Sequence, residues 1–201
     1  MEYKFPEHIK QRLQEAVKSD VGISLDLGAG DIQQEGFIGI DKTPSPYVDI
    51  CMDLEELPYK DIPDECASLL MAGQIVEHLK PWLFIDIMNE WWRITKLGGQ
   101  LMIGTPYAGS LGFWQDPTHV HGFNELSFKY FDPLDATWGN AFYSIYKPKP
   151  WKLEKNLWSN TGNLEILLTK IPDDPSYHKL DLKPPFFPVL GVKQSNGTKT
   201  D

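Results

Sequence analysis

The sequence predicts an α/β fold: a doubly wound, mostly parallel sheet with helices on both faces and an antiparallel C-terminal edge. Two observations predict it. Up to residue 104, short apolar runs alternate with helical patterns, which is typical of parallel strands joined by crossover helices. Beyond a loop rich in Gly, Pro, Asp and His, further apolar runs follow one another without long helices. These last strands are therefore expected to pair in an antiparallel manner.

The first half of the chain begins with an amphipathic pattern. Residues 1–19 hold the N-terminal helix, in which Ile9, Leu13 and Val17 share one face and Pro6 lies in the first turn. Short apolar runs predict strands at 21–27, 37–40, 48–52, 67–71 and 100–104. Residues 81–96 predict a long helix that begins at a proline and is ended by Gly98 and Gly99.

The second half predicts an insertion followed by an edge. Residues 105–135 form a loop and helix insertion over the carboxyl end of the sheet, with a short helix at 124–130 capped by Asn124. Strands are predicted at 142–146, 151–157 and 164–169. Residues 1–190 are expected to form a single domain, and the polar residues 191–201 a disordered tail.

Composition limits the partners. The net charge of −9 disfavours nucleic acids, whose affinity for proteins depends on neutralising phosphates. No apolar run approaches the roughly 20 residues that span a bilayer, and the N-terminus lacks a secretion signal. Cys51 and Cys66 have no metal-type spacing and are expected to be reduced thiols. We therefore expect a cytoplasmic protein that binds neither DNA nor membranes; its oligomeric state is not predicted.

The segment LDLGAGDIQQEGFIGID, residues 25–41, poses the main functional question. Gly28 and Gly30 match the first two positions of a dinucleotide fingerprint, but Gln33 takes the third. Asp41 follows Gly30 by only 11 residues, whereas the fingerprint places its acidic residue about 20 positions on, after a full helix. That helix binds the pyrophosphate. The sequence thus disfavours hydride transfer, and residues 33–36 are expected to form a tight connection without a helix.

Three carboxylates end successive predicted strands. Asp26, Asp41 and Asp53 lie at the carboxyl ends of parallel strands, where open sheets bind their ligands. An anion at Asp26 suits a cation, Asp41 can accept the hydroxyls of a ribose, and Asp53 can meet an adenine edge. Acidic residues after strands also occur in ordinary turns, so each one alone is ambiguous.

The set of segments resembles the class I S-adenosylmethionine-dependent methyltransferases, which have a Rossmann-like fold. The matching segments are LDLGAG (25–30), DLEELP (53–58), GQIVEHL (73–79) and ITKLGGQLMIGTP (94–106). The shortened connection after Gly30 resembles a bacterial and phage subset, in which segments like DPTH (116–119) also occur. The resemblance implies a cofactor, S-adenosylmethionine, and a product, S-adenosylhomocysteine.

The resemblance also assigns residues to parts of that cofactor. Gly28, Ala29 and Gly30 would contact the methionine part, with Asp26 beside them. Asp41, followed by Lys42, would hold the ribose. Asp53 and Leu54 would face adenine, and Gln74 and His78 would lie near the methionine end.

Candidate catalytic residues lie in WQDPTHVHGF, residues 114–123, within a long irregular segment of the kind that often carries function. His119 is the best candidate for a general base or substrate ligand, with Asp116 orienting it and His121 a weaker candidate. The alternative is that Asp116 and His119 only fix the loop. His119, His121 and Asp116, with His78 or Glu77, also have metal-ligand types. Because His-x-His converges only in an extended loop, we expect no fixed metal.

The predicted function is methyl transfer from S-adenosylmethionine to a small-molecule or glycan nucleophile, with oxygen as the expected acceptor atom. Enzymes that methylate exocyclic base amines often carry D/N-P-P-Y/F after the fourth strand, where this chain reads MAGQ (71–74). DNA is thereby disfavoured as an acceptor. Two alternatives stay open: a non-catalytic cofactor-binding or scaffold module, and an RNA or protein methyltransferase. Tyr107, Phe113 and Trp114 can line a substrate pocket.

Overall fold

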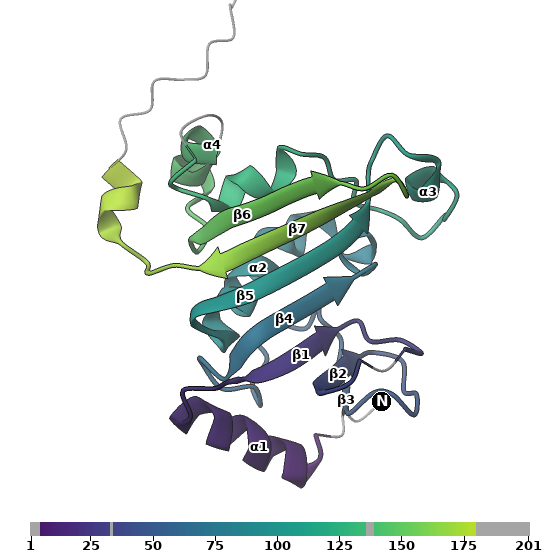
Figure 1. The fold of residues 1–201 in the computed structure, drawn as a ribbon, viewed down its shortest axis with the longest axis vertical. Helices are drawn as coiled ribbons and strands as arrows, with labels where there is room; N and C mark the ends of the chain where they lie inside the picture. Colours follow the sequence, from purple (N-terminus) through teal and green to yellow (C-terminus); the bar gives the residue numbers. More distant parts are fainter. Residues whose placement is uncertain (1–4, 33, 136–138, 180–201) are drawn as a thin grey trace, which may run out of the picture.

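The computed structural model describes residues 5–32, 34–135 and 139–179, and in these residues seven strands form one sheet (Figure 1). The strands are β1 Ile23–Leu27, β2 Phe37–Asp41, β3 Ile50–Cys51, β4 Ala67–Gly73, β5 Thr95–Pro106, β6 Trp151–Trp158 and β7 Asn163–Lys170. Their order is β3-β2-β1-β4-β5-β7-β6, with β1 to β5 parallel and β7 antiparallel to both of its neighbours. The predicted α/β fold class is confirmed.

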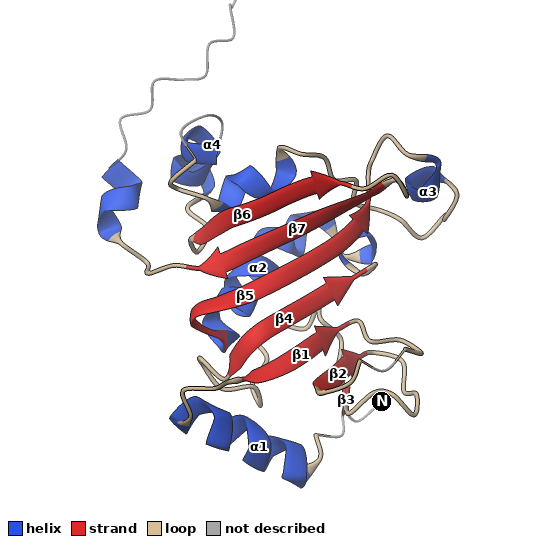
Figure 2. Ribbon diagram, in the orientation of Figure 1, coloured by secondary structure: helices blue, strands red, loops and turns tan. Residues whose placement is uncertain are grey.

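The helices of the described residues are mostly short (Figure 2). They are α1 Glu7–Lys18, η1 Val76–His78, η2 Pro81–Leu83, α2 Phe84–Ile94, α3 Leu111–Trp114, η3 Ser127–Phe131, α4 Gly139–Tyr146 and η4 Pro175–Lys179. α1 agrees with the predicted amphipathic helix and buries Ile9 and Leu13. None of the helices in the described part of the chain has both the length and the apolar character that crossing a bilayer requires.

The predicted end of the long helix was wrong. α2 ends at Ile94, because Thr95 takes an extended conformation and pairs with Ala67 as the first residue of β5. Gly98 and Gly99 therefore lie inside a strand. The pairing of β4 with β5 shifts register between the pairs Ala67–Thr95 and Leu69–Gln100. Gly98, whose φ is +78°, lies in this irregular stretch of β5. The two glycines shape a bulge instead of a helix cap.

Two further sequence predictions differ from the structure. Residues 142–146 lie in helix α4 and not in a strand; Tyr143 is buried there. The predicted helix at 124–130 is a 3₁₀ helix that begins only at Ser127, while Asn124 Oδ1 accepts from Leu126 N ahead of it. The predicted disordered tail, 191–201, lies outside the described residues, as does Gln33. Between β1 and β2 the remaining residues form turns and no helix.

The core lies mainly on one face of the sheet. Leu25, Leu70, Leu101 and Leu168 are fully buried and stand side by side in register across four strands. Helix α2 lies behind this sheet in the view of Figure 2. On the opposite face, Met102 remains 47% exposed. The two faces are thus unequally covered, and the carboxyl ends of β1 to β5 meet at one edge.

Candidate active site: two adjoining cavities

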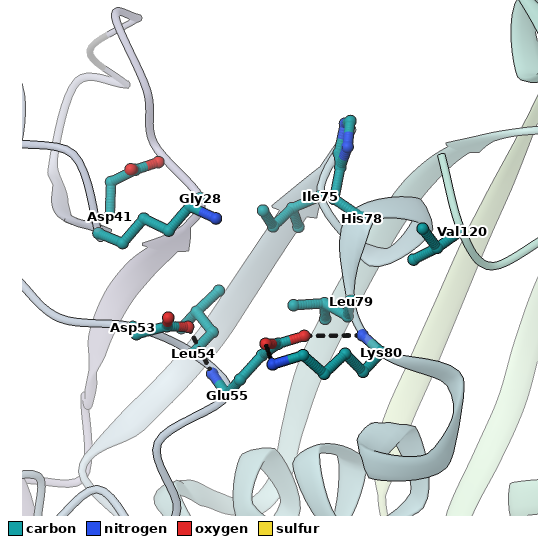
Figure 3. Close-up of a pocket in the computed structure, with 11 residues that line it drawn as sticks. Gly28, Asp41, Asp53, Leu54, Glu55, Ile75, His78, Leu79, Lys80 and Val120 are labelled. Carbon is teal, nitrogen blue, oxygen red and sulfur yellow. Dashed lines mark hydrogen bonds and ion pairs between the residues drawn. The ribbon is translucent and has the colours of Figure 1, made fainter. Parts of the chain in front are cut away.

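A cavity of about 420 Å³ opens at the carboxyl ends of β1 to β4 (Figure 3). Its lining residues are Gly28, Asp41, Lys42, Asp53, Leu54, Glu55, Ile75, His78, Leu79, Lys80 and Val120. We refer to it as the first cavity. Of the residues that the sequence singled out, it brings together Gly28, Asp41, Lys42, Asp53, Leu54 and His78. Its volume is within the range of small-molecule sites.

Gly28 occupies a position that only glycine fits. Its φ is +80°, and a Cβ atom there would lie 2.6 Å from Cγ1 of Ile75. The loop is fixed to β2 because Gly28 N and Ala29 N both donate to the carbonyl oxygen of Ile40, at 2.8 and 3.0 Å. The chain therefore passes close to the cavity without a side chain in the way.

Asp41 organises the end of β2. Its Oδ2 accepts a hydrogen bond from Gly30 N at 3.1 Å and its Oδ1 accepts one from Thr43 N at 2.7 Å. Each carboxylate oxygen has a further lone pair, so Asp41 can also accept hydroxyl groups from a ligand. Gly30 does not line the first cavity but holds the carboxylate that does.

Asp53 is held by a local hydrogen bond and Leu54 by contacts that lead to helix α2. Asp53 Oδ1 accepts from Glu55 N at 2.9 Å, and the buried Tyr59 hydroxyl donates to the Leu54 carbonyl at 2.9 Å. Trp91 Nε1 in turn donates to the Tyr59 hydroxyl at 3.2 Å. These buried contacts fix the backbone of the cavity wall against the core.

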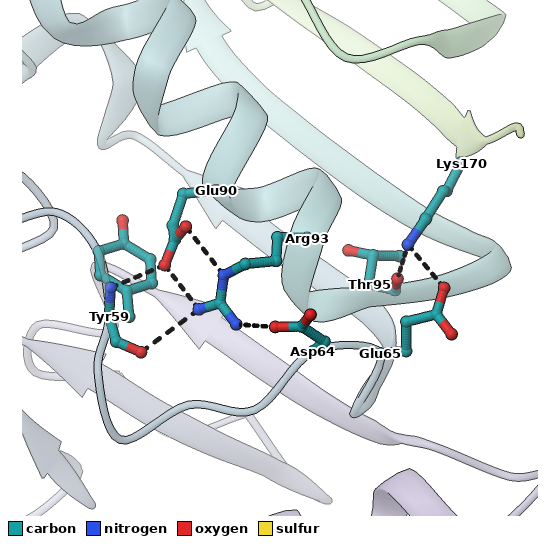
Figure 4. Close-up of polar contacts among 7 residues, drawn as sticks. All are labelled: Tyr59, Asp64, Glu65, Glu90, Arg93, Thr95 and Lys170. Carbon is teal, nitrogen blue, oxygen red and sulfur yellow. Dashed lines mark hydrogen bonds and ion pairs between the residues drawn. The ribbon is translucent and has the colours of Figure 1, made fainter. Parts of the chain in front are cut away.

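A charged network extends this support (Figure 4). Glu90 accepts from Tyr59 N at 2.7 Å and from Arg93 Nε at 2.9 Å. Arg93 also pairs with Asp64 and donates to the Tyr59 carbonyl. The segment from Leu54 to Tyr59 is thus anchored to one helix through neutral and charged hydrogen bonds.

Asp26 does not line the first cavity. Its side chain borders a small space that is also lined by Ala29, Gly39 and Tyr47. Burial, and secondarily the charge of Asp41, raises the pKa of Asp26 to about 6. Asp26 is only 6% exposed. Asp26 and Ala29 therefore border this smaller space and do not line the first cavity.

A second cavity, of about 330 Å³, adjoins the first, because His78 lines both. Its lining residues are Gln74, Glu77, His78, Pro106, Gly112, Gln115, Asp116, His119, Thr161 and Asn163. Gln74 has a positive φ of +53° and donates from its backbone N to Gly104 O at 2.7 Å. Non-glycine residues adopt this conformation at an energetic cost, and such residues cluster at functional sites.

The predicted pair of Asp116 and His119 is assembled in this second cavity. His119 Nδ1 lies 2.8 Å from the carbonyl oxygen of Phe113, to which it donates, so Nε2 carries the free lone pair. Nε2 is 3.8 Å from Asp116 Oδ2. Hydrogen bonds from the Thr118 side chain and backbone lower the pKa of Asp116. Thr118 also contacts His78 Nδ1 through its hydroxyl, at 3.1 Å. One loop thereby links both histidines.

His121 lies elsewhere. Its ring packs against Phe84 and Phe123, with centroids 5.0 and 4.1 Å apart. Burial lowers its pKa to about 4, so the ring is neutral near pH 7. Because His121 lines neither cavity, we leave it out of the proposed site.

Glu77 is the most unusual residue of the second cavity. Its side chain is fully buried, and Oε2 accepts from the Thr105 hydroxyl at 3.0 Å. Oε1 is buried with no hydrogen-bond partner in the described part of the chain. Burial raises the pKa of this carboxyl. The sequence indicated Glu77 only as an optional metal ligand, because nothing local shows that a helix-start glutamate is buried.

Several lining residues carried no sequence signal. Glu55 and Lys80 form an ion pair of 2.6 Å across the floor of the first cavity. Thr161 reaches the second cavity from the turn between β6 and β7, and Asn163 reaches it as the first residue of β7. Their contribution depends on pairing between distant strands, which spacing along the chain does not reveal.

Comparisons with solved structures show which known proteins share this fold. A SAM-dependent methyltransferase from Archaeoglobus fulgidus superposes with a TM-score of 0.54 at 18% identity, covering 82% of this chain and 94% of that one. A variant of the 16S rRNA (adenine(1408)-N(1))-methyltransferase from Catenulisporales acidiphilia gives 0.51 at 13%, covering 81% and 91%. The chain has the fold of these methyltransferases.

A third neighbour carries ligands. The 1,6-didemethyltoxoflavin-N1-methyltransferase of Burkholderia thailandensis, with bound 1,6-didemethyltoxoflavin and S-adenosylhomocysteine, gives a TM-score of 0.51 at 9% identity, covering 81% of this chain and 80% of that one. No protein-family model and no curated protein matches the sequence. The named acceptors of the neighbours differ, so the likeness establishes the fold and not the acceptor.

Proposed function

We propose that this protein is a methyltransferase that binds S-adenosylmethionine in the first cavity and a small-molecule or glycan acceptor in the second. The observation that carries the proposal is the junction of the two cavities at His78. A methyl donor in one cavity can there face a nucleophile in the other. The shared fold with solved S-adenosylmethionine-dependent enzymes supports it.

The first cavity suits a nucleoside without phosphates. Asp41 and Asp53 offer oxygen acceptors to hydroxyl and amino groups. Lys80 is paired with Glu55, so the two aspartates outweigh the remaining cation of the wall, Lys42, and disfavour a phosphate. Between β1 and β2, the described residues form turns in place of the helix whose N-terminus binds a pyrophosphate. A cationic sulfonium ligand fits this acidic environment better than a dinucleotide does.

Methyl transfer from a sulfonium needs alignment more than activation of the leaving group. An oxygen nucleophile also needs help in losing its proton. We place the acceptor beside His119, whose Nε2 is left free by the hydrogen bond from Nδ1 to Phe113 O. The net charge of −9 favours a small molecule or glycan over RNA. The free thiols Cys51 and Cys66 suit the cytoplasm that we propose as its location.

Calorimetric titration with S-adenosylhomocysteine tests the assignment of the first cavity. Asp41→Ala should weaken binding by about 1.5–3 kcal/mol, the range for hydrogen bonds to charged groups. Asp20→Ala is the matched control, because Asp20 is an exposed carboxylate ahead of β1, at the opposite end of that strand. An equal affinity of wild type and Asp41→Ala would show that Asp41 does not hold the ribose.

A further inference from the structure

The second cavity contains a compact group of metal-ligating side chains. One candidate ligand atom from each of Glu77, His78 and His119 lies within 4.8 Å of the other two. This set differs from the His-x-His pair suggested by the sequence, since His121 packs among phenylalanines. We infer that Glu77, His78 and His119 form a site for a divalent transition-metal ion that binds the acceptor oxygen.

The buried oxygen of Glu77 is the first support. Oε1 is fully buried and has no hydrogen-bond partner among the described residues, although the other oxygen binds Thr105. Leaving a buried acceptor without a partner costs about 1–3 kcal/mol, and more for a charged group. Buried polar groups of this kind need a partner, which a bound ion or water supplies. A cation beside Glu77 would satisfy the oxygen.

The hydrogen bond of His119 is the second support. Metal-binding histidines almost always donate their other ring N–H to a carbonyl or carboxylate, which fixes the tautomer and directs the free nitrogen at the ion. His119 makes this contact with Phe113 O. His78 stands edge-on to it, with ring centroids 4.7 Å apart, and its Nδ1 faces the Thr118 carbonyl and hydroxyl. Both rings are therefore held by the same loop.

The donor set defines the class of ion. Two imidazoles and one carboxylate leave open positions and suit Zn²⁺, Co²⁺ or Fe²⁺ better than Mg²⁺ or Ca²⁺, which prefer oxygen ligands alone. Bond lengths of about 2.0–2.2 Å in a tetrahedral site place ligand atoms about 3.3–3.6 Å apart. The candidate ligand atoms, which lie within 4.8 Å of one another, would move closer when the ion binds.

The role of the ion rests on the proposed function. A hydroxyl group of the acceptor binds the ion through its oxygen, which lowers the pKa of the hydroxyl. Its proton passes to solvent water. The oxygen then bonds to the methyl carbon as the carbon–sulfur bond breaks, and that electron pair stays on sulfur. The products are a methyl ether and the neutral thioether S-adenosylhomocysteine. The acceptor class is therefore an alcohol, including sugars and hydroxy acids.

Cobalt titration tests the site without any need for turnover. The full chain is treated with a chelator, and Co²⁺ binding is followed by visible absorption and calorimetry, with Zn²⁺ as competitor. We expect one ion per chain. Glu77→Gln and His119→Ala should each weaken binding by at least about 100-fold, above the 10–100-fold typical of outer-shell partners. His8→Ala, an exposed histidine on α1, is the matched control and should bind as wild type does.

Thermal unfolding shows which variants fold, and Glu77→Gln keeps the shape of the buried side chain if His119→Ala does not fold. S-adenosylhomocysteine is titrated in parallel. Cofactor binding with no stoichiometric Co²⁺, or with Co²⁺ retained in both site variants, overturns the metal site and leaves the methyltransferase proposal intact. Site-dependent Co²⁺ binding without cofactor binding supports the metal site and rejects the proposed function.

Discussion

Asp26→Asn should remove a pH-dependent penalty from the folded state. The carboxyl of Asp26 has a pKa of about 6 in the fold, raised from 3.8 by burial and by Asp41. Between these values the folded protein binds more protons than the unfolded chain, so stability falls as the pH rises through this window. Relative to pH 8, the wild type at pH 5 gains about 1.4 kcal/mol from this one group.

The assay is urea unfolding of wild type and Asp26→Asn at both pH values. The unfolding free energy of Asp26→Asn minus that of the wild type should be about 1.4 kcal/mol larger at pH 8 than at pH 5. Other titrating groups contribute equally to both proteins and cancel in this difference. Asp20→Asn is the control, since Asp20 is exposed. A difference in unfolding free energy between wild type and Asp26→Asn that stays constant from pH 5 to pH 8 would contradict the raised pKa of Asp26.

Three further changes follow from the same structure. Gly28→Ala combines a positive φ with a close contact against Ile75, whereas Gly30→Ala meets open space. Gly28→Ala should therefore destabilise the fold by about 1–3 kcal/mol more than Gly30→Ala, as measured by urea unfolding. Equal losses of stability would argue against the close approach at Gly28. Tyr59→Phe should cost about 1–3 kcal/mol of unfolding free energy by leaving Leu54 O and Trp91 Nε1 unpaired, and a neutral result would contradict the role of this hydroxyl. Lys170→Ala should destabilise by about 2–4 kcal/mol, because the 2%-exposed ammonium donates to Thr95 O and Glu65 (Figure 4); Lys170→Met should cost less in the same assay.

The sheet and the first cavity were largely predictable because their signals are local. Apolar runs and the residues that follow them specify where parallel strands end, and the register then brings Gly28, Asp41 and Asp53 to one edge. The short distance from Gly30 to Asp41 correctly excluded a helix in the described part of that connection. Each of these inferences needs only the spacing of nearby residues.

Tertiary contacts explain what the sequence could not predict. Residues 142–146 have strand-like composition, yet α4 packs on η3 and Tyr143 contacts Tyr177, so packing outweighs propensity. The direction of His121 depends on Phe84, which comes from a distant helix. The burial of Glu77 depends on Thr105 in β5. None of these partners is visible in the spacing that suggested a His-x-His pair.

We propose that the first cavity binds a nucleoside with a sulfur-linked methionine and not a dinucleotide. Calorimetry of the wild-type chain with S-adenosylhomocysteine, and separately with NADH, tests it directly. The structure predicts one molecule of S-adenosylhomocysteine per chain and no saturable binding of NADH, because the described residues after Gly28 provide no helix N-terminus for a pyrophosphate. The absence of binding heat with S-adenosylhomocysteine at high micromolar concentration, or saturable binding of NADH, would contradict this proposal.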